Sequence, residues 1–306
     1  MSIMVTGGKG FIGRRLVEKL EKNGNKVVVV DKENDGILNR EYLSESLKDV
    51  SLVFHLGAVS GSIFFSDDPV HAVRVNCEGT VNLLEMALKA GVKRVVFAGT
   101  MSAYGFTPIP HMEDGPISCP NAYVASKIFG EKMMRLYFEN RDLETVLLRF
   151  ASVYGMGEET KKGGIVGNPL TQFIWSVLSG KPPKIFDKGT QTRDLVFVDD
   201  VVSALMAAAT FGSPGDIYNV ATDVETSMNE AIDILSLIHG IKIRADYVPY
   251  KPYDQQKIYI DRQRASFEKL HQATGWKPRF DVQMGAKIAY HYYKEHPELV
   301  PEFFRR

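Results

Sequence analysis

A tyrosine and a lysine one helical turn apart could form an acid/base pair. Residues 123–127 read Y-V-A-S-K, which puts Tyr123 and Lys127 four positions apart. Side chains at this spacing share one face of a helix. A lysine ammonium beside a phenol favours the phenolate and lowers the pKa of the phenol. The spacing therefore predicts that Lys127 makes Tyr123 a usable acid and base near neutral pH.

Glycines at a regular spacing near the start of the chain could bind a dinucleotide. Residues 6–13 read T-G-G-K-G-F-I-G, in which every third position from residue 7 is glycine. Glycine lets the backbone turn tightly and approach a pyrophosphate, and the start of the next helix offers free N–H groups and a positive dipole end to the phosphates. We expect this contact to be made by Gly7, Gly10, Phe11, Ile12 and Gly13.

An acidic residue indicates which dinucleotide binds. Asp31 ends the apolar run Val27–Val30 and follows the glycine motif by about 20 residues, where a carboxylate bonds the adenosine ribose hydroxyls. A carboxylate here would repel the 2′-phosphate of NADP, so Asp31 predicts NAD. Lys32, the next residue, leaves NADP open as an alternative.

Positioning these residues requires strands and helices in alternation, and the hydrophobic pattern predicts both. Apolar runs indicate strands, and apolar residues three and four apart indicate helices. The expected strands span residues 3–5, 27–30, 52–56, 94–98, 145–149 and 195–198, and the expected helices span 11–23, 75–89, 123–138 and 170–178, with another from 199. The alternation predicts an α/β fold with a Rossmann-type, doubly wound parallel sheet. The all-apolar run 27–30 predicts a strand buried on both faces.

The pattern loosens after Ser152, which predicts a smaller, mixed α/β substrate lobe towards the C-terminus. We expect residues 1–165, joined by 191–212, to form the NAD-binding domain, and residues 166–190 and 213–306 to form the substrate-binding lobe. The glycine- and charge-rich segment Gly155–Pro169 is either a lid or a solvated connection.

Composition excludes several classes of protein. The 306 residues carry 37 Lys+Arg and 37 Asp+Glu, and this zero balance argues against broad binding to nucleic acid or an anionic membrane. A membrane span needs about 18 consecutive apolar residues, and no apolar run of this sequence is that long. A strand that begins at residue 3 leaves no room for a signal peptide. Cys77 and Cys119 are too few for a disulfide framework, and the 7 histidines lack metal-ligand spacing. We expect a cytoplasmic protein with no metal.

Further motifs follow in order along the chain. They are H-L-G-A at 55–58, N-C-E-G-T at 76–80, F-A-G-T-M-S-A-Y-G at 97–105, L-R-F-A-S-V-Y-G at 148–155, Q-T-R-D at 191–194 and G-W-K-P at 275–278. With the glycine motif and Tyr123/Lys127, they resemble the extended short-chain dehydrogenase/reductase family over nearly the whole chain. The resemblance is greatest to its nucleotide-sugar epimerases of the UDP-glucose 4-epimerase type.

The resemblance implies a role for each matching residue. Thr100 would hydrogen-bond the sugar oxygen that loses its proton, Tyr123 would be the catalytic acid/base, and Lys127 would hold the nicotinamide ribose. Beyond the glycine turn and Asp31, the resemblance implies that NAD is bound by Leu56, Ala58, Asn76, Tyr123 and Lys127. It also implies a homodimer, formed through the helices predicted at 75–89 and 122–138.

The implied substrate is a nucleotide-diphosphate sugar. Its implied contacts are Ser60, Ser102, Ser152, Asn168, Phe186, Arg193 and Lys251. Two of these residues have an alternative interpretation: Phe186 as a core residue, and Arg193 as the ion-pair partner of Asp194 or Asp199.

The resemblance also bears on the reaction. Related 4,6-dehydratases carry Asp-Glu directly after the hydroxyl residue, and related uronate decarboxylases carry glutamate at the second of these positions. Here the two positions hold Met101 and Ser102, and neither side chain is an acid. The resemblance therefore favours a UDP-glucose/UDP-galactose 4-epimerase that works by transient oxidation to a 4-keto sugar with tightly bound NAD. An NAD-dependent sugar or nucleotide-sugar dehydrogenase/reductase and a non-catalytic NAD-sensing protein stay open as alternatives.

Overall fold

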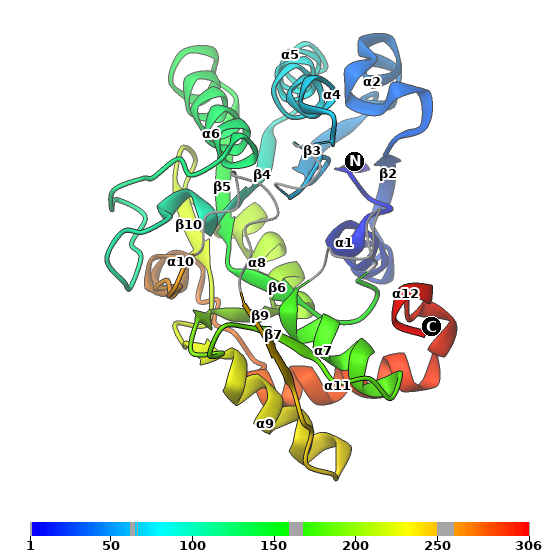
Figure 1. Ribbon diagram of the computed structural model, residues 1–306. Helices are drawn as coiled ribbons and strands as arrows, with labels where there is room; N and C mark the ends of the chain where they lie inside the picture. Colours follow the sequence, from blue (N-terminus) through cyan, green and yellow to red (C-terminus); the bar gives the residue numbers. More distant parts are fainter. Residues whose placement is uncertain (1, 62–64, 66, 159–167, 250–259, 306) are drawn as a thin grey trace.

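A six-stranded parallel sheet forms the centre of the molecule (Figure 1). The computed structural model describes residues 2–61, 65, 67–158, 168–249 and 260–305. The sheet has the order β10-β5-β4-β3-β1-β2. Its strands are β1 (Ser2–Thr6), β2 (Lys26–Val30), β3 (Val50–His55), β4 (Arg94–Thr100), β5 (Glu144–Phe150) and β10 (Ile217–Val220). Because β2 and β3 flank β1 on opposite sides, the winding reverses at β1, and a crevice opens at the carboxyl ends of β1 and β3.

Helices cover both faces of this sheet, as the alternation of strands and helices predicts. One face carries α2 (Arg40–Ser46), α5 (Gly79–Lys89) and α6 (Ala122–Arg141), and the other carries α1 (Phe11–Lys22), α8 (Val198–Phe211) and α10 (Glu268–Thr274). Successive strand residues point to opposite faces. Val95 and Leu147 accordingly pack in one hydrophobic cluster, whereas Val96 and Leu148 pack in the other.

The strand β2 differs from its prediction. It pairs only with β1 and forms an edge of the sheet. Val30 is fully buried, but Val27, Val28 and Val29 are partly exposed. The expectation of burial on both faces is wrong here, because an edge strand lacks a second neighbour and the helices cover it less completely.

A third hydrophobic cluster lies towards the C-terminus, around Trp175 and Tyr293. It joins α7 (Pro169–Leu178), α9 (Met228–His239), α11 (Val282–Glu295) and α12 (Glu302–Arg305), seen at the bottom of Figure 1. Three two-stranded pairs accompany it: β6 (Ser152–Tyr154) with β9 (Leu195–Phe197), β7 (Lys184–Phe186) with β12 (Asp246–Val248), and β8 (Thr192–Arg193) with β11 (Thr226–Ser227).

Two segments of the predicted second lobe lie with the first: β10, and α10, whose Leu270 packs in the cluster on one face of the central sheet. β10 falls within 213–306, yet it pairs with β5 in the central sheet through Ile217 and Leu147. The predicted boundary at residue 213 is wrong for this strand. The remaining helical segments are η1 (Glu33–Leu38), α4 (Pro69–Val73), η2 (Arg74–Glu78), η3 (Met101–Tyr104) and η4 (Pro297–Leu299). Among the described residues, no helix has the length and apolar character needed to cross a membrane.

Candidate active site

The glycine motif forms a tight turn between β1 and α1 that suits a pyrophosphate. Gly7 has φ +68°, and a Cβ on it would lie 2.8 Å from the Gly57 nitrogen. A Cβ on Gly13 would lie 2.1 Å from the Gly7 oxygen, so α1 can begin this close to the turn only with glycine there. Gly10 caps α1 without a side-chain hydrogen bond, and the first turn has no acidic residue. The helix therefore offers its first N–H groups to an anion.

Asp31 lies at the carboxyl end of β2 and is held by the backbone. Its two carboxylate oxygens accept hydrogen bonds from the Lys9 N–H at 2.9 Å and the Lys32 N–H at 3.0 Å. Each oxygen keeps a lone pair for a ribose hydroxyl. The Lys9 ammonium pairs with Glu33. Two carboxylates at this edge of the crevice disfavour a 2′-phosphate, in agreement with NAD.

The structure brings Thr100, Tyr123 and Lys127 together. Thr100 ends β4, and its hydroxyl hydrogen-bonds the Tyr123 phenol near the start of α6. The phenol ring packs edge-on against Phe65, with 6.0 Å between centroids. Lys127, one turn further along α6, is buried, and its Nζ lies 4.8 Å from the centre of the Phe97 ring. The predicted acid/base pair thus lies at the carboxyl end of the sheet beside a hydroxyl donor.

Burial dominates the electrostatics of this pair. It raises the pKa of Tyr123 to about 12, opposed by the hydrogen bond with Thr100. It lowers the pKa of Lys127 to about 8, opposed by the charge of Glu131. The direction for Tyr123 is opposite to the prediction from the spacing, because loss of water around the phenol dominates its pKa. In this fold Tyr123 is protonated at neutral pH and needs further positive charge to act as a base.

Asn76 joins the loop after β3 to the catalytic helix. Its amide oxygen accepts from the Val59 N–H at 2.8 Å, and its amide nitrogen donates to the Val59 carbonyl at 3.0 Å and to Ser126 Oγ at 2.9 Å. The Ser126 hydroxyl in turn donates to the Tyr123 carbonyl at 2.7 Å. Asn76 therefore orients the segment that holds Leu56, Ala58 and Ser60. It lies in η2, a π-helical turn of the kind that often marks functional sites.

His55 links the glycine turn to the same helix. Its Nδ1 lies 2.8 Å from Thr6 Oγ1, and its Nε2 lies 3.0 Å from Thr80 Oγ1. Thr80 donates to the Asn76 carbonyl at 2.7 Å, so its oxygen accepts from Nε2, and Nδ1 accepts from Thr6. Only the neutral Nε2–H tautomer satisfies this chain. Burial and the charge of Lys127 lower the pKa of His55 to about 3, which agrees with a neutral ring.

The candidate substrate residues fall into separate groups. Ser102 is the second residue of η3, directly after Met101, and its N–H donates to Thr100 Oγ1 at 3.2 Å. Ser152 Oγ accepts from the Asn168 amide at 3.0 Å. Asn168 Oδ1 accepts from the Leu170 N–H at 2.9 Å, so this side chain caps α7. Contact of these residues with a substrate stays a prediction.

The alternatives for Phe186 and Arg193 do not hold. Phe186 is 47% exposed and is no core residue. Arg193 donates to the carbonyls of Thr192 at 2.6 Å and Ile260 at 2.9 Å. The ion pairs of the described residues join Arg193 to neither Asp194 nor Asp199. Lys251 and positions 159–167 of Gly155–Pro169 lie outside the described residues.

The sequence interpretation missed a buried ion pair next to Lys127. Glu131 lies one turn beyond Lys127 on α6 and pairs with Arg149 of β5 at 2.7 Å. The signal was present, because Tyr123, Lys127 and Glu131 are spaced by four, and Arg149 interrupts an apolar strand. A charge inside such a strand indicates a buried partner.

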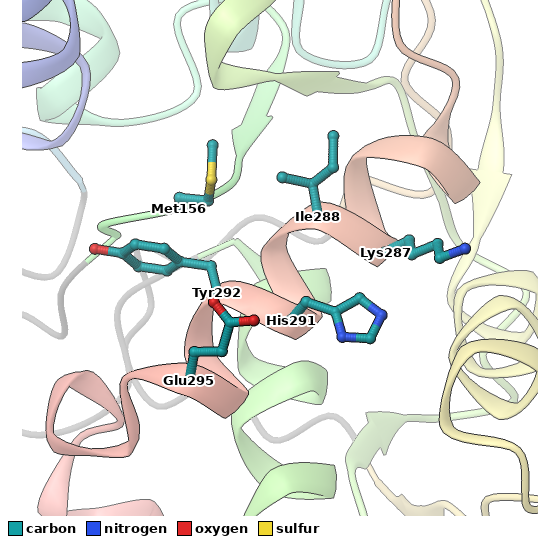
Figure 2. Close-up of a pocket in the computed structure, with 6 residues that line it drawn as sticks. All are labelled: Met156, Lys287, Ile288, His291, Tyr292 and Glu295. Atoms are coloured by element: carbon teal, nitrogen blue, oxygen red, sulfur yellow. The ribbon is translucent and has the colours of Figure 1, made fainter.

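Two surface cavities lie apart from these catalytic side chains. The one in Figure 2, of about 410 Å³, is lined by Met156 and by Lys287, Ile288, His291, Tyr292 and Glu295 of α11. The other, of about 470 Å³, lies between α1 and α8. Among the described residues, no group of three His, Cys, Asp or Glu side chains is placed to hold a metal.

The chain is similar to known proteins over most of its length. The NAD dependent epimerase/dehydratase family matches residues 3–221. The chain is 32% identical to a UDP-glucose 4-epimerase of Mycolicibacterium smegmatis, over 93% of this chain and 96% of that protein. It is 30% identical to a UDP-glucuronate 4-epimerase of Thermodesulfobacterium geofontis, over 97% of both chains. It is 29% identical to a UDP-N-acetyl-alpha-D-glucosaminuronate decarboxylase of Bacillus cytotoxicus, over 95% of this chain and 97% of that protein.

Solved structures extend the comparison to ligands. A Thermotoga maritima UDP-glucose 4-epimerase with UDP-glucose superposes with a TM-score of 0.86 at 28% identity, covering 97% of this chain and all of that one. A Thermus thermophilus UDP-glucose 4-epimerase with NAD gives a TM-score of 0.83 at 28% identity, covering 96% and 99%.

Proposed function

The chain belongs to the NAD dependent epimerase/dehydratase family, whose cofactor is NAD, and on that premise we propose that it is a nucleotide-sugar 4-epimerase of the UDP-glucose/UDP-galactose type. The observation that carries the proposal is the Thr100 hydroxyl on the Tyr123 phenol, with the Lys127 ammonium one turn away. The two residues after Thr100 carry no carboxyl group. A decarboxylase or dehydratase would need an acid there, so the site favours inversion at C4 without elimination.

Each of the three side chains has one task in the proposed reaction. Tyr123 takes the proton of the sugar C4 hydroxyl, and Thr100 hydrogen-bonds the same oxygen. Lys127 holds the nicotinamide ribose and favours the phenolate. When bound, NAD⁺ supplies the hydride acceptor and a positive charge that offsets the burial of Tyr123. After the 4-keto sugar has turned over in the site, its C4 takes the hydride back on the opposite face while Tyr123 returns the proton to the oxygen, so net oxidation is zero.

A panel of UDP-, dTDP- and GDP-sugars tests the proposal. Product sugars and NADH absorbance are followed together with the purified protein. Inversion at C4 of UDP-glucose or UDP-galactose without net NADH is expected. Stoichiometric NADH would instead indicate a dehydrogenase, and no change with any sugar would indicate a binding protein. C4 inversion confined to UDP-glucuronate, the substrate named for one relative, would correct the sugar.

The variant Tyr123→Phe tests the assignment of the acid/base. Removal of one phenol oxygen is expected to lower turnover by a factor of at least about 10³ and to leave NAD bound. Tyr247→Phe, at an exposed position of β12, is the matched control and is expected to keep full activity. Near wild-type turnover of Tyr123→Phe would remove Tyr123 from the mechanism.

We also propose that the chain works as a cytoplasmic homodimer. Phe129 and Leu136 are 39% and 48% exposed on the outer face of α6, and Val73 of α4 is 45% exposed. A second copy would cover these large apolar side chains, which are otherwise exposed to water. Light scattering is expected to give twice the 34.2 kDa chain mass, and Phe129→Glu with Leu136→Glu is expected to halve it. Both cysteines are free thiols, in keeping with a reducing compartment.

A further inference from the structure

Three charged side chains are buried together behind the acid/base pair. Lys127 is 6% exposed, Glu131 4% and Arg149 1%. Charges this deep are costly unless each has a partner of opposite sign. Glu131 pairs with Arg149 at 2.7 Å, and Lys127 lies one helical turn before Glu131 on the same face of α6.

The Glu131 carboxylate is fixed in place by the sheet. Arg149 donates Nη2 to one carboxylate oxygen at 2.7 Å and Nε to the other at 3.1 Å. Its Nη1 donates to the Tyr104 hydroxyl at 3.0 Å, and Tyr104 donates to Asn219 at 2.7 Å. This network joins α6 to η3, β5 and β10. A bidentate arrangement with all donors satisfied leaves the carboxylate little freedom to move.

Neighbouring glycines make room for the ion pair. A Cβ on Gly99 would lie 3.0 Å from Glu131 Oε1, and a Cβ on Gly130 would lie 2.5 Å from the Phe97 ring. Both glycines allow α6 to lie close to β4. The close approach puts Lys127 over the Phe97 ring and Glu131 against the sheet. The catalytic helix is therefore held at this depth by buried charge as well as by apolar packing.

We propose that Glu131 is a positioning residue for Lys127: its carboxylate, fixed by Arg149, keeps the Lys127 ammonium charged and in place on the catalytic face of α6. The inference rests on the proposed function, in which Lys127 acts as an ammonium. Burial alone lowers the pKa of Lys127, and Glu131 opposes that effect. Without Glu131, the ammonium keeps its contact with the Phe97 ring, whose centre lies 4.8 Å from Nζ.

The other groups near Lys127 cannot replace Glu131. His55 of β3 is neutral, because its pKa is lowered to about 3. The Tyr123 phenol is protonated at neutral pH, and burial raises the pKa of the Cys77 thiol in η2. Tyr104 bonds Arg149, and Glu113 accepts from the Asn219 N–H at 2.7 Å. The other charges on α6 and on the elements packed against it pair with one another or are exposed: Arg94 with Glu144, Arg74 with Glu78, Glu85 with Arg141, Arg135 with Glu139, and the exposed Lys89 and Lys132.

The direct test is the titration of Lys127 in the NAD-free protein. The ¹⁵Nζ resonance of Lys127, assigned by its loss in Lys127→Met, is followed against pH in wild type and in Glu131→Gln. The titration is expected to move at least about one pH unit lower in the variant, the effect of losing an opposite charge one turn away. Glu139→Gln is the matched control, because Glu139 lies on the same helix and pairs with Arg135 at the surface. It is expected to leave the titration unchanged.

Activity provides a second readout. In Glu131→Gln the alkaline limb of the pH profile of kcat/KM is expected to move to lower pH by the same amount. Glu131→Asp, which keeps the carboxylate, is expected to reverse part of this shift. If Glu131→Gln fails to fold, the double variant Glu131→Gln/Arg149→Met removes the unpaired cation, and its Lys127 titration is expected to move in the same direction. An unchanged titration in either variant would overturn the proposal. A shifted titration in a protein that epimerises no sugar would overturn only the proposed function, because the resonance is measured without substrate.

Discussion

The neutral His55 ring makes stability depend on pH in a way that can be calculated. Its pKa is about 3 in the fold against 6.5 in an unfolded chain. Between these values the unfolded state binds a proton that the folded state does not, so the free energy of unfolding falls as the pH falls. The slope is about 1.4 kcal/mol per pH unit, which amounts to about 2 kcal/mol at pH 5 and about 4 kcal/mol at pH 3, where half of the folded molecules also bind the proton.

The variant His55→Leu separates this effect from other titrations. At pH 7 it leaves the buried Thr6 hydroxyl without the acceptor it has in wild type, which costs about 1–3 kcal/mol. Leucine does not titrate, so the variant lacks the decline contributed by His55. Its stability is therefore expected to approach and then exceed that of wild type near pH 5. Other groups, such as Asp194 with a pKa raised to about 6, act equally in both proteins and cancel in the difference.

Urea unfolding of both proteins between pH 7 and pH 4.5, followed by tryptophan fluorescence, measures this difference. His71→Leu, at an exposed position of α4, is the matched control for loss of a surface histidine. Two parallel curves for wild type and His55→Leu would refute the reasoning, because they would show that His55 takes up its proton equally in both states. A ¹⁵N spectrum with the Nδ1–H tautomer would also refute the hydrogen-bond order from Thr6 to Thr80.

Three further predictions concern the glycine turn at Gly13, the Asp194 carboxylate and the Asn76 amide. Gly13→Ala is expected to lower the affinity for NAD, measured by calorimetry, at least about 100-fold. The new Cβ would lie 2.1 Å from the Gly7 oxygen and would push α1 away from the turn. Gly91→Ala, with no atom within 4 Å of its Cβ, is the control and is expected to bind NAD normally. Asp194→Asn is expected to lower the free energy of unfolding by about 2–4 kcal/mol in urea, because this carboxylate accepts from the Thr222 N–H and hydroxyl at 2.8 Å and from two further N–H groups; an unchanged midpoint would contradict that role. Asn76→Asp is expected to lower turnover about tenfold with little change in KM, because it removes the amide donor to Ser126; a rise in KM alone would place Asn76 at the substrate instead.

Local patterns were sufficient to predict most of the sheet and the placement of Tyr123 and Lys127 on one helix. Val95 and Val96 lie in an apolar run, and such a run indicates a strand whichever strands lie beside it in the sheet. The spacing of the glycines up to Gly13 and the spacing of Tyr123 and Lys127 are also local patterns, so both could be read directly from the sequence. The pairing of Ile217 with Leu147 joins residues far apart in the chain, and for that reason β10 was assigned to the wrong lobe.

Properties that depend on burial were not accessible from the sequence. The pKa of Tyr123 was expected to fall, because the spacing shows Lys127 but not the loss of water around the phenol. Glu131 and Arg149 come from a helix and a strand, and their pairing follows only from the packing of α6 on β5. The bond between Ser152 and Asn168 likewise appears only once α7 is placed.

The proposed reaction is C4 inversion by oxidation and reduction within one site. UDP-glucose carrying deuterium at C4, incubated with the NAD-loaded protein, tests it most directly. The expected product is UDP-galactose that keeps the deuterium at C4, with no NADH released and no deuterium lost to water. Net NADH in proportion to substrate, or a product that has lost its C4 deuterium, would contradict it.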